Sequence, residues 1–400
     1  MAKGSPHSRS SRMNAARKTR VRKHVLLALS WYAEGLHAGV ARFAKEANWA
    51  LDASLLHAFQ PTGTWHGDGI IWIAGVNPRL DQFVKRSRKP VVNIGYVDTP
   101  GIPRVISDPD AVMEMALEHF QSSGFHNFAF YLHADTPGPQ VKMEAFRNAV
   151  ERAAGAFFQI DLPQELRRRQ SPAKKSPYQW LAQAVRKLPR PLAVIAETDD
   201  PAIQILHACI ESGIHVPGEV AVLGINDDFL RCPLASIPLS SIDDNMEGIG
   251  YRAAVILSEL MEGHQSLPGL TLIPPRGLTV RQSTDALAFE NLQVARAMQL
   301  IRAKYRDTVT AQDISALIPV SKRHLHTVFL QETGRTVAEE LMHRRIAYAA
   351  ELLLETDEKI PTIAKRCGLR NANRMTRSFK RVQGMTPGDF RRQRGVINPK

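Results

Sequence analysis

Two short stretches near the C-terminal end carry side chains suited to contacting nucleic acid. Arginine can bond guanine through two hydrogen bonds and asparagine can bond adenine in the same way, while lysine suits phosphate oxygens. Such residues recur at helical spacing in SKRHLHTVFLQETG and ANRMTRSFKRVQG, each with apolar residues on the opposite side. The residues expected to face outward are Ser321, Lys322, Arg323, His326, Thr327, Ala372, Asn373, Arg374, Arg377 and Lys380. This pattern predicts contacts to base edges, supported by contacts to phosphates.

A short helical segment and a tight turn precede each of these stretches. AQDISALI leads into the first stretch across Pro319 and Val320, and IPTIAKRCG leads into the second across LRN. A helix, a brief turn and a second helix with a polar outer face are the parts of a helix-turn-helix unit. The sequence therefore predicts two such units.

A second set of polar and aromatic residues follows predicted strands in the first 285 residues. In parallel sheets, small ligands bind beyond the carboxyl ends of the strands. The residues expected there are Trp31, Tyr32, Asp108, Lys142, Thr198, Asp199 and Asn226, with Asp227 and Asp228 beside the last. An aspartate in such a position also often caps the next helix, an alternative that applies to about half of this set. Trp72 lies within an apolar run and is expected in the core.

The residues that would support catalysis are not arranged for it. The chain has no GxxxxGK[ST] phosphate loop and no GxSxG nucleophile elbow, and its three cysteines form no CxxC pair. The adjacent pairs Asp199-Asp200 and Asp227-Asp228 cannot flank one bond, and His324 and His326 stand two apart on one helix. We expect no enzyme activity, no cofactor and no metal site.

The elements that hold the second set alternate between short apolar runs and helical stretches. Strand-like runs occur at 24–30, 69–75, 90–96, 104–108, 128–134, 192–198, 219–227 and 271–280, with helices expected at 35–47, 110–120, 140–154, 201–212 and 247–261. Alternating apolar strands and helices predict parallel sheets covered on both faces. Because a region of about 260 residues with this many strands exceeds what one sheet ordinarily carries, we expect an α/β domain of two lobes over residues 24–285.

From residue 291 onward the pattern is helical throughout. Apolar residues recur at three and four over 292–301, 310–317, 321–332, 338–354, 361–366, 373–382 and 387–394, with no strand-like run. Residues 281–290 resemble a linker, and residues 163–178 form a basic loop containing proline. The sequence thus predicts an all-α domain over residues 286–400.

Charge is unevenly distributed over the 400 residues, whose net charge is +13. Residues 1–24 hold eight Lys and Arg and no acid, residues 291–400 carry a balance of +11, and residues 25–290 carry −6. A basic terminal domain on an acidic body indicates a polyanionic partner. Residues 1–23 are expected to be a disordered basic tail. Since no run approaches 18 apolar residues, we expect no membrane contact and a cytoplasmic location.

The C-terminal region resembles the arabinose-regulator (AraC) family of transcription factors. The matching residues are Ser321, Leu325, Phe329, Gly334, Arg345, Ala349, Leu352, Leu353, Ile363, Ala364, Gly368, Leu369, Phe379, Lys380, Gly384, Thr386, Pro387, Phe390 and Arg391. Met375 stands where an aromatic residue is usual. The resemblance implies base contacts by Arg323, His326, Thr327, Ala372, Asn373, Arg374 and Arg377 in double-stranded operator DNA.

The central region resembles the sugar-binding domain of lactose- and ribose-repressor regulators, which is similar to periplasmic sugar-binding proteins. The matching stretches are 32–40, 106–108, 196–199, 224–228 and 239–250. The resemblance implies sugar contacts by Trp31, Tyr32, Glu34, Asp108, Lys142, Thr198, Asp199 and Asn226. Asn226 stands where an acidic residue is common, and Lys142 where arginine is usual. The two domains together resemble the xylose operon regulator (XylR) subgroup, which makes a monosaccharide such as xylose the expected effector.

Our hypothesis is a DNA-binding regulator, expected to be a homodimer, whose lobes close on a sugar and so change how the DNA-binding domains are presented. The helix over 338–354 is expected to hold the two recognition helices about 34 Å apart, one turn of DNA. RNA polymerase is a further candidate partner, and activation and repression both stay open. Two alternatives also stay open: a sugar-binding transport component, and a regulator whose pocket no longer binds sugar.

Overall fold

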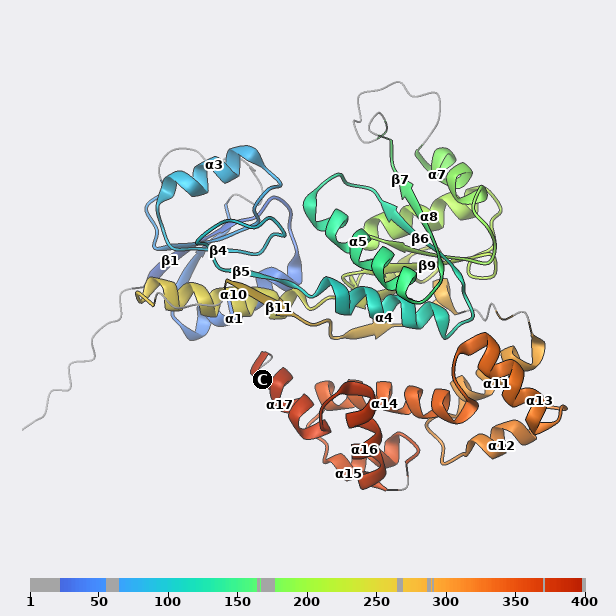
Figure 1. Cartoon of the computed structure of the whole chain (residues 1–400). Coiled ribbons are helices and arrows are strands. Elements are labelled where there is room, and N and C mark those ends of the chain that lie inside the picture. The colour runs from blue at the N-terminus through green and yellow to red at the C-terminus, as the bar shows by residue number, and fades with distance from the viewer. Residues whose placement is uncertain are drawn as a thin grey trace, which may run out of the picture.

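The computed structural model describes residues 22–54, 65–163, 166, 177–264, 269–285, 289, 291–369 and 371–397. Two α/β lobes lie side by side, and a helical domain lies below them (Figure 1). This arrangement confirms the predicted α/β architecture followed by an all-α region. Most of the expected basic tail, and parts of the basic loop at 163–178 and of the linker at 281–290, lie outside the described residues.

The amino-terminal lobe is built on a six-stranded sheet with the order β11-β5-β4-β3-β1-β2, and its strand pairs are parallel. Its strands are β1 (Lys23–Ala28), β2 (Trp49–Asp52), β3 (Gly69–Trp72), β4 (Val91–Asn93), β5 (Arg104–Ser107) and β11 (Leu270–Ile273). Its helices are α1 (Glu34–Glu46), α3 (Pro78–Ser87) and α10 (Met246–Met261). As expected, Trp72 is part of the core, at 1% exposure.

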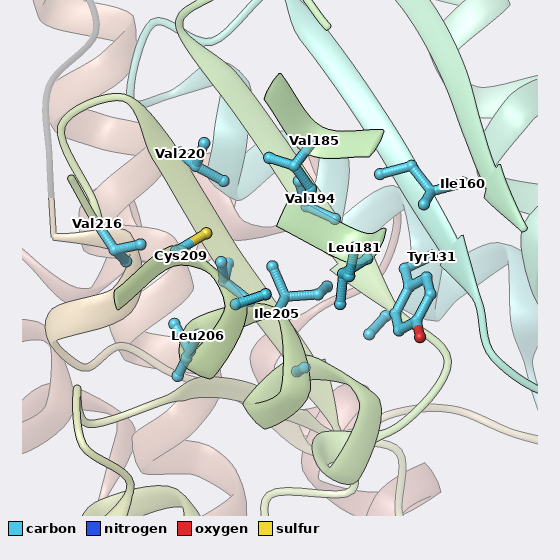
Figure 2. Packing of buried hydrophobic residues seen from close by; sticks show 14 of the residues in the cluster. Tyr131, Ile160, Leu181, Val185, Val194, Ile205, Leu206, Cys209, Val216 and Val220 are labelled. Atoms are coloured by element: carbon cyan, nitrogen blue, oxygen red, sulfur yellow. The ribbon is translucent and has the colours of Figure 1, made fainter. Parts of the chain in front are cut away.

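The carboxyl-terminal lobe has a second six-stranded sheet, in the order β12-β10-β9-β8-β6-β7. Its strands are β6 (Asn127–Leu132), β7 (Ala156–Asp161), β8 (Leu192–Ala196), β9 (Val220–Ile225), β10 (Ser240–Asp243) and the antiparallel β12 (Gly277–Thr279). Its helices are α4 (Pro109–Gln121), α5 (Pro137–Arg152), α7 (Pro177–Arg186), α8 (Asp199–Glu211) and the short α9 (Arg231–Leu234). Figure 2 shows apolar side chains of α7 and α8 packed against β8 and β9.

The described chain passes between the lobes at three places: from β5 to α4, from β10 to α10, and from β11 to β12. Helices α1 and α10 cross closely, because glycines lie at the contact. A Cβ atom on Gly39 would lie 2.0 Å from the carbonyl oxygen of Glu247, and one on Gly250 would lie 2.2 Å from that of Leu36. Glycine is therefore required at both positions for this crossing.

The C-terminal domain contains helices α11 to α17. Their bounds are α11 (Leu292–Lys304), α12 (Ala311–Ala316), α13 (Lys322–Thr333), α14 (Val337–Glu355), α15 (Ile360–Arg366), α16 (Ala372–Gln383) and α17 (Pro387–Ile397). Helix α14 contributes to two cores: Val337 and Leu341 pack with α11, α12 and α13, whereas Ile346 and Leu352 pack with α15, α16 and α17. The long helix thus fixes the two halves relative to each other.

Several elements differ from the sequence-based expectation. Strands β2, β7 and β10 were not expected, because β2 is half-buried after Trp49, β7 is largely exposed and β10 reads SSID. The single run expected at 271–280 is two strands in different lobes, since Pro274 and Pro275 interrupt it. Helix α4 begins one residue before the expected 110, at Pro109, which lacks an N–H and suits the first helical position, and its capping residue is Asp108.

Candidate effector site and DNA-binding helices

Helix α13 is the second helix of the first helix-turn-helix unit, after α12. The Ser321 hydroxyl accepts a hydrogen bond from the His324 N–H at 3.2 Å and caps the helix. Leu325 and Phe329 are buried in the core, whereas Lys322, Arg323, His326 and Thr327 are exposed. The Thr327 hydroxyl donates to the Arg323 carbonyl at 3.1 Å. The polar face of this helix therefore points away from its own domain.

Helix α16 has the same design in the second unit, after α15. The Asn371 side chain accepts a hydrogen bond from the Asn373 N–H at 2.7 Å and caps the helix. Met375 and Phe379 are buried, and the polar residues on the other side, Asn373, Arg374, Arg377 and Lys380, are exposed. Ala372 is half-buried. Met375 fills the core position where an aromatic residue is usual in the family.

Two arginines hold the connections that place these units. Arg345 is 6% exposed and donates to the carbonyls of Tyr305, Asp307 and Val309 at 2.8, 2.6 and 2.8 Å. Arg391 donates to those of Leu353, Thr356 and Glu358 at 3.3, 3.2 and 2.8 Å. Each guanidinium thus binds the carbonyl groups of the segment that enters one helix-turn-helix unit, so that the two units are held in equivalent ways.

The residues expected to bind an effector lie around the carboxyl ends of both sheets. Lys142 on α5 is buried, with its Nζ 3.7 Å from Asp244 Oδ2 and 3.4 Å from the Glu197 carbonyl. Burial would lower the pKa of Lys142, but Asp244, Tyr96 and Glu197 together raise it above its usual value. The ammonium therefore stays charged, and burial raises the pKa of Asp244.

Asp199, at the start of α8, is occupied by contacts within the protein. Its carboxylate accepts hydrogen bonds from Ser241 Oγ at 2.5 Å and from the Asp228 N–H at 2.9 Å. Burial raises the pKa of Asp199 to about 6. These bonds shape the turn after β9, where Asn226 and Asp227 have φ of 108° and 49°. Asp199 thereby holds Asp228, two residues after Asn226 in the same turn.

The remaining expected residues are spread over both lobes. Trp31 and Tyr32 follow β1 and are 39% and 58% exposed, and Glu34, at the start of α1, is also exposed. Asp108 accepts a hydrogen bond from the Ala111 N–H at 3.1 Å, so its side chain has the helix-capping role that the sequence left open. Thr198 is half-buried before α8 and makes no capping bond with its side chain.

The structure adds residues that the sequence analysis did not select. Besides Asp244, these are Glu197, which accepts from the N–H groups of His133 and Ala134, and the Tyr96 hydroxyl, which lies 2.6 Å from Ser107 Oγ. Asp244 was missed because it follows β10, whose polar sequence does not resemble a buried strand. The Asp243-Asp244-Asn245 run just before α10 was the available signal.

Several buried polar atoms at these strand ends have no hydrogen-bond partner among the described residues. They are Ser30 Oγ after β1, Asn226 Oδ1 after β9, and both carboxylate oxygens of Asp244 after β10. Buried polar groups are nearly always hydrogen-bonded in folded proteins, so these exceptions make the strand ends candidate positions for contacts with a polar ligand. A surface hollow of about 710 Å³ elsewhere, lined by Leu132, Asp135 and Asp161 among others, contains none of the expected effector residues.

None of the helices in the described part of the chain has the length and apolar character needed to span a membrane. Within the same residues, no group of three or more His, Cys, Asp or Glu side chains is arranged to hold a metal ion.

Comparison with known proteins identifies both domains. Residues 117–284 match the periplasmic binding protein-like domain family, and residues 314–393 match a helix-turn-helix domain family. The xylose operon regulatory protein of Haemophilus influenzae is 29% identical over 329 residues, covering 79% of this chain and 82% of that protein. The protein of the same name in Escherichia coli K12 is 27% identical over 343 residues, covering 82% and 84%.

Solved structures share the fold. The structure of the xylose-binding transcription activator xylR matches with a TM-score of 0.55 and 24% identity, covering 92% of this chain and 98% of that one. A LacI family regulator from Enterococcus faecalis V583 with bound ribose matches with a TM-score of 0.51 and 16% identity, covering 66% and 99%. The chain is therefore a homologue of the xylose operon regulators, with a periplasmic-binding-protein-like domain followed by an AraC-type helix-turn-helix domain.

Proposed function

We propose that this sugar-sensing transcription regulator takes an aldopentose as its effector, with D-xylose as the first candidate. The observation that carries the proposal is the set of unpartnered acceptors at the strand ends, with Asp244 beside the buried Lys142. The relatives named for the xylose operon support xylose in particular.

The chemistry of these groups suits a neutral polyol. Asn226 Oδ1 and the Asp244 carboxylate can accept hydrogen bonds from sugar hydroxyls, and Lys142 can donate to them. Because Lys142 already faces one buried carboxylate, a second negative charge is not required at the site. Trp31 and Tyr32, exposed at the end of β1, are available to pack on a sugar ring when the lobes close.

In the mechanism we favour, the sugar stabilises one relative arrangement of the two lobes, because its contacts come from both. A ligand shifts such an equilibrium only by its difference in affinity for the two arrangements. The DNA-binding domains then place α13 and α16 in successive major-groove segments, which lie about 34 Å apart in B-DNA. The proposed base readers are Arg323, His326, Thr327, Ala372, Asn373, Arg374 and Arg377, and the DNA surface is completed by Ser321, Lys322 and Lys380.

The remaining partner assignments rest on the same account. We infer that two copies act together at an operator, that RNA polymerase is a contact partner at promoters, and that the protein works in the cytoplasm, where its DNA lies. The relatives that match along most of the chain are named as regulators rather than as enzymes. Boundaries at residues 24–285 for the sensor and 286–400 for the DNA-binding domain belong to this proposal.

Thermal unfolding with and without sugars tests the effector assignment. A ligand at 100 times its Kd adds roughly 2.7 kcal/mol of stability, which produces a clear rise in Tm. D-Xylose should raise the Tm of the wild-type protein and of Glu144→Gln, a substitution on the exposed part of α5 beside Lys142. The same concentration of sugar should raise the Tm of Asp244→Asn by no more than about half as much as that of the wild type. A wild-type protein that responds to no pentose, hexose or sugar phosphate would instead favour a regulator whose pocket has changed its ligand.

A further inference from the structure

Helix α4 connects the effector region to the DNA-binding domain. Its first residue follows Asp108, whose N–H donates to the Ile273 carbonyl of β11 at 2.8 Å, where the chain leaves the amino-terminal lobe. Its 13 residues span about 20 Å at 1.5 Å per residue. Its other end points toward the helical domain, close to α11 and α14 (Figure 1).

The last turn of α4 and the residues after it contact the DNA-binding domain through polar groups. Glu118 Oε1 forms ion pairs across the contact, at 2.9 Å from His343 Nε2 and 3.6 Å from Arg335 Nη2. Arg344 Nη2 donates to Ser122 Oγ at 2.6 Å, and Arg302 Nη2 donates to Ser123 Oγ at 2.5 Å. Together these residues form what we call the docking contact: Glu118, Ser122 and Ser123 from the carboxyl-terminal lobe, and Arg302, Arg335, His343 and Arg344 from the DNA-binding domain.

Helix α4 is held rigidly by the carboxyl-terminal lobe. Val112, Met113, Ala116 and Phe120 are buried in the core that β6, β8 and β9 share. His119 is also buried, and its Nε2 lies 2.8 Å from Thr284 Oγ1, at the start of the segment leading to the DNA-binding domain. The DNA-binding domain is thus docked on one lobe through a helix that belongs to that lobe.

The docking contact is polar and partly exposed, which suits a reversible connection. The Glu118 side chain is 44% exposed, Arg335 is 36% and His343 is 23% exposed. Burial alone would raise the pKa of Glu118, but the hydrogen bond to His343 and the charges of His343, Arg335 and Arg344 lower it, so the carboxylate is charged. Ion pairs of this kind contribute little individually, so the contact opens without exposing a large apolar surface.

We propose that the docking contact fixes the orientation of the DNA-binding domain on the carboxyl-terminal lobe, so that movement of the two lobes reorients α13 and α16 through α4. The transmission by sugar rests on the function proposed above, whereas the docking itself does not. When docking is lost, the DNA-binding domain samples many orientations, and operator binding must restrict them again.

Glu118 and Glu114 provide a matched pair of variants, because they lie one turn apart on α4. Glu114 accepts from Arg152 at 3.1 Å within the carboxyl-terminal lobe, whereas Glu118 faces the DNA-binding domain. Glu118→Ala and Glu114→Ala remove the same group from the same helix. Both side chains are partly exposed, so both full-length variants should fold, which their Tm values check.

The first comparison uses no sugar. In Glu118→Ala, amide hydrogen exchange should become faster in the last turn of α4 and in the first half of α14. The DNA probe is a duplex that the wild-type protein selects from a random library. The affinity of Glu118→Ala for this duplex should be about fivefold lower than that of the wild type. Glu114→Ala should match the wild type in both measurements. If Glu118→Ala also matches Glu114→Ala in exchange and in duplex affinity, the docking proposal is wrong.

The second comparison adds D-xylose. The ratio of duplex affinities with and without D-xylose should move toward one in Glu118→Ala and should be unchanged in Glu114→Ala. An unchanged ratio in Glu118→Ala would overturn the transmission through α4. A wild-type protein that ignores D-xylose would instead contradict the proposed effector, and the sugar-free comparison would still decide whether docking controls DNA binding.

Discussion

Lys142 Nζ lies 3.7 Å from Asp244 Oδ2, and the two side chains are 7% and 1% exposed. The carboxylate oxygens of Asp244 have no hydrogen-bond partner among the described residues. An ion pair buried in this way loses solvation, and the Asp244 carboxylate lacks the hydrogen bonds that would compensate for it. A polar ligand that donates hydroxyl groups would supply them, which makes this pair the centre of the proposed effector site.

Replacing Asp244 with Asn should weaken D-xylose binding by about 10- to 100-fold, because hydrogen bonds to a charged group contribute roughly 1.5–3 kcal/mol each. Isothermal titration calorimetry of the full-length variant measures this. Glu144→Gln serves as the control and should bind like the wild type. A variant with unchanged D-xylose affinity would remove Asp244 from the site.

Arg377→Ala should cost about 1–3 kcal/mol at a single base position and relax sequence preference there, because Arg377 lies on the exposed face of α16. Binding to a panel of duplexes with single-base changes measures the effect. Arg392→Ala, on α17 and 78% exposed, is the control and should keep the wild-type preference. A loss that is equal on all duplexes would make Arg377 a phosphate contact instead.

Arg345→Met should lower the free energy of unfolding by about 3 kcal/mol, since three carbonyl groups lose a charged donor. Urea unfolding checks the value, with the exposed Arg296→Met as a control that should change stability little. The same variant should reduce DNA affinity, because Arg345 holds the segment entering the first helix-turn-helix unit. Unfolding curves that coincide with the wild type would show that these bonds are not needed.

His119 should make the protein less stable in acid. Burial first, and then the charges of Arg344 and Arg302, lower its pKa from 6.5 to about 3. Because the unfolded chain binds a proton at higher pH than the folded one, this stability is complete above pH 6.5 and is lost as the pH falls toward 3, by up to about 1.4 kcal/mol per pH unit. Urea unfolding of His119→Asn between pH 7 and 5 should show a smaller loss than the wild type. Equal losses would mean that His119 titrates normally.

Asp199 should affect the pH dependence of stability in the opposite direction to His119. Because its pKa is about 6 rather than 3.8, the folded state favours the protonated acid, and stability falls as the pH rises from about 4 to about 6. Asp199→Asn cannot ionise, so its melting temperature relative to the wild type should increase across that range. A constant difference between the two proteins from pH 4 to 7 would contradict the raised pKa. The variant should also respond less to D-xylose, because Asp199 holds the turn that carries Asn226.

The sequence indicated the architecture well wherever a pattern was local. The helices from 292 to 397 and the apolar strands β3, β6, β8 and β9 could be predicted from the order of apolar and polar residues within each segment, without knowledge of tertiary contacts. Strand β10 could not be identified, because Ser240 and Ser241 are buried through hydrogen bonds to Ser283, Arg281 and Asp199 from distant segments. The sequence shows the two prolines that separate β11 from β12. It does not show that the two strands belong to different lobes.

Some of the proposed effector and docking residues could likewise be selected from the sequence, and others could not. Lys142, Thr198, Asp199 and Asn226 could be selected as candidates from the sequence, because they follow strands or lie on the next helix. Asp244 and Ser30 were not, because a missing hydrogen-bond partner is a property of the folded surroundings. Glu114 and Glu118 cannot be distinguished in the sequence, although one bonds within its own lobe and the other across to the DNA-binding domain.

The most direct test of the central claim is the affinity of the full-length protein for its selected duplex, measured by fluorescence anisotropy with and without D-xylose. L-Xylose, which has the same composition and opposite configuration, is the matched control. The account predicts that D-xylose changes the Kd by about fivefold or more, that L-xylose does not, and that binding weakens steeply with salt. A Kd that is the same with D-xylose, with L-xylose and without sugar would contradict it.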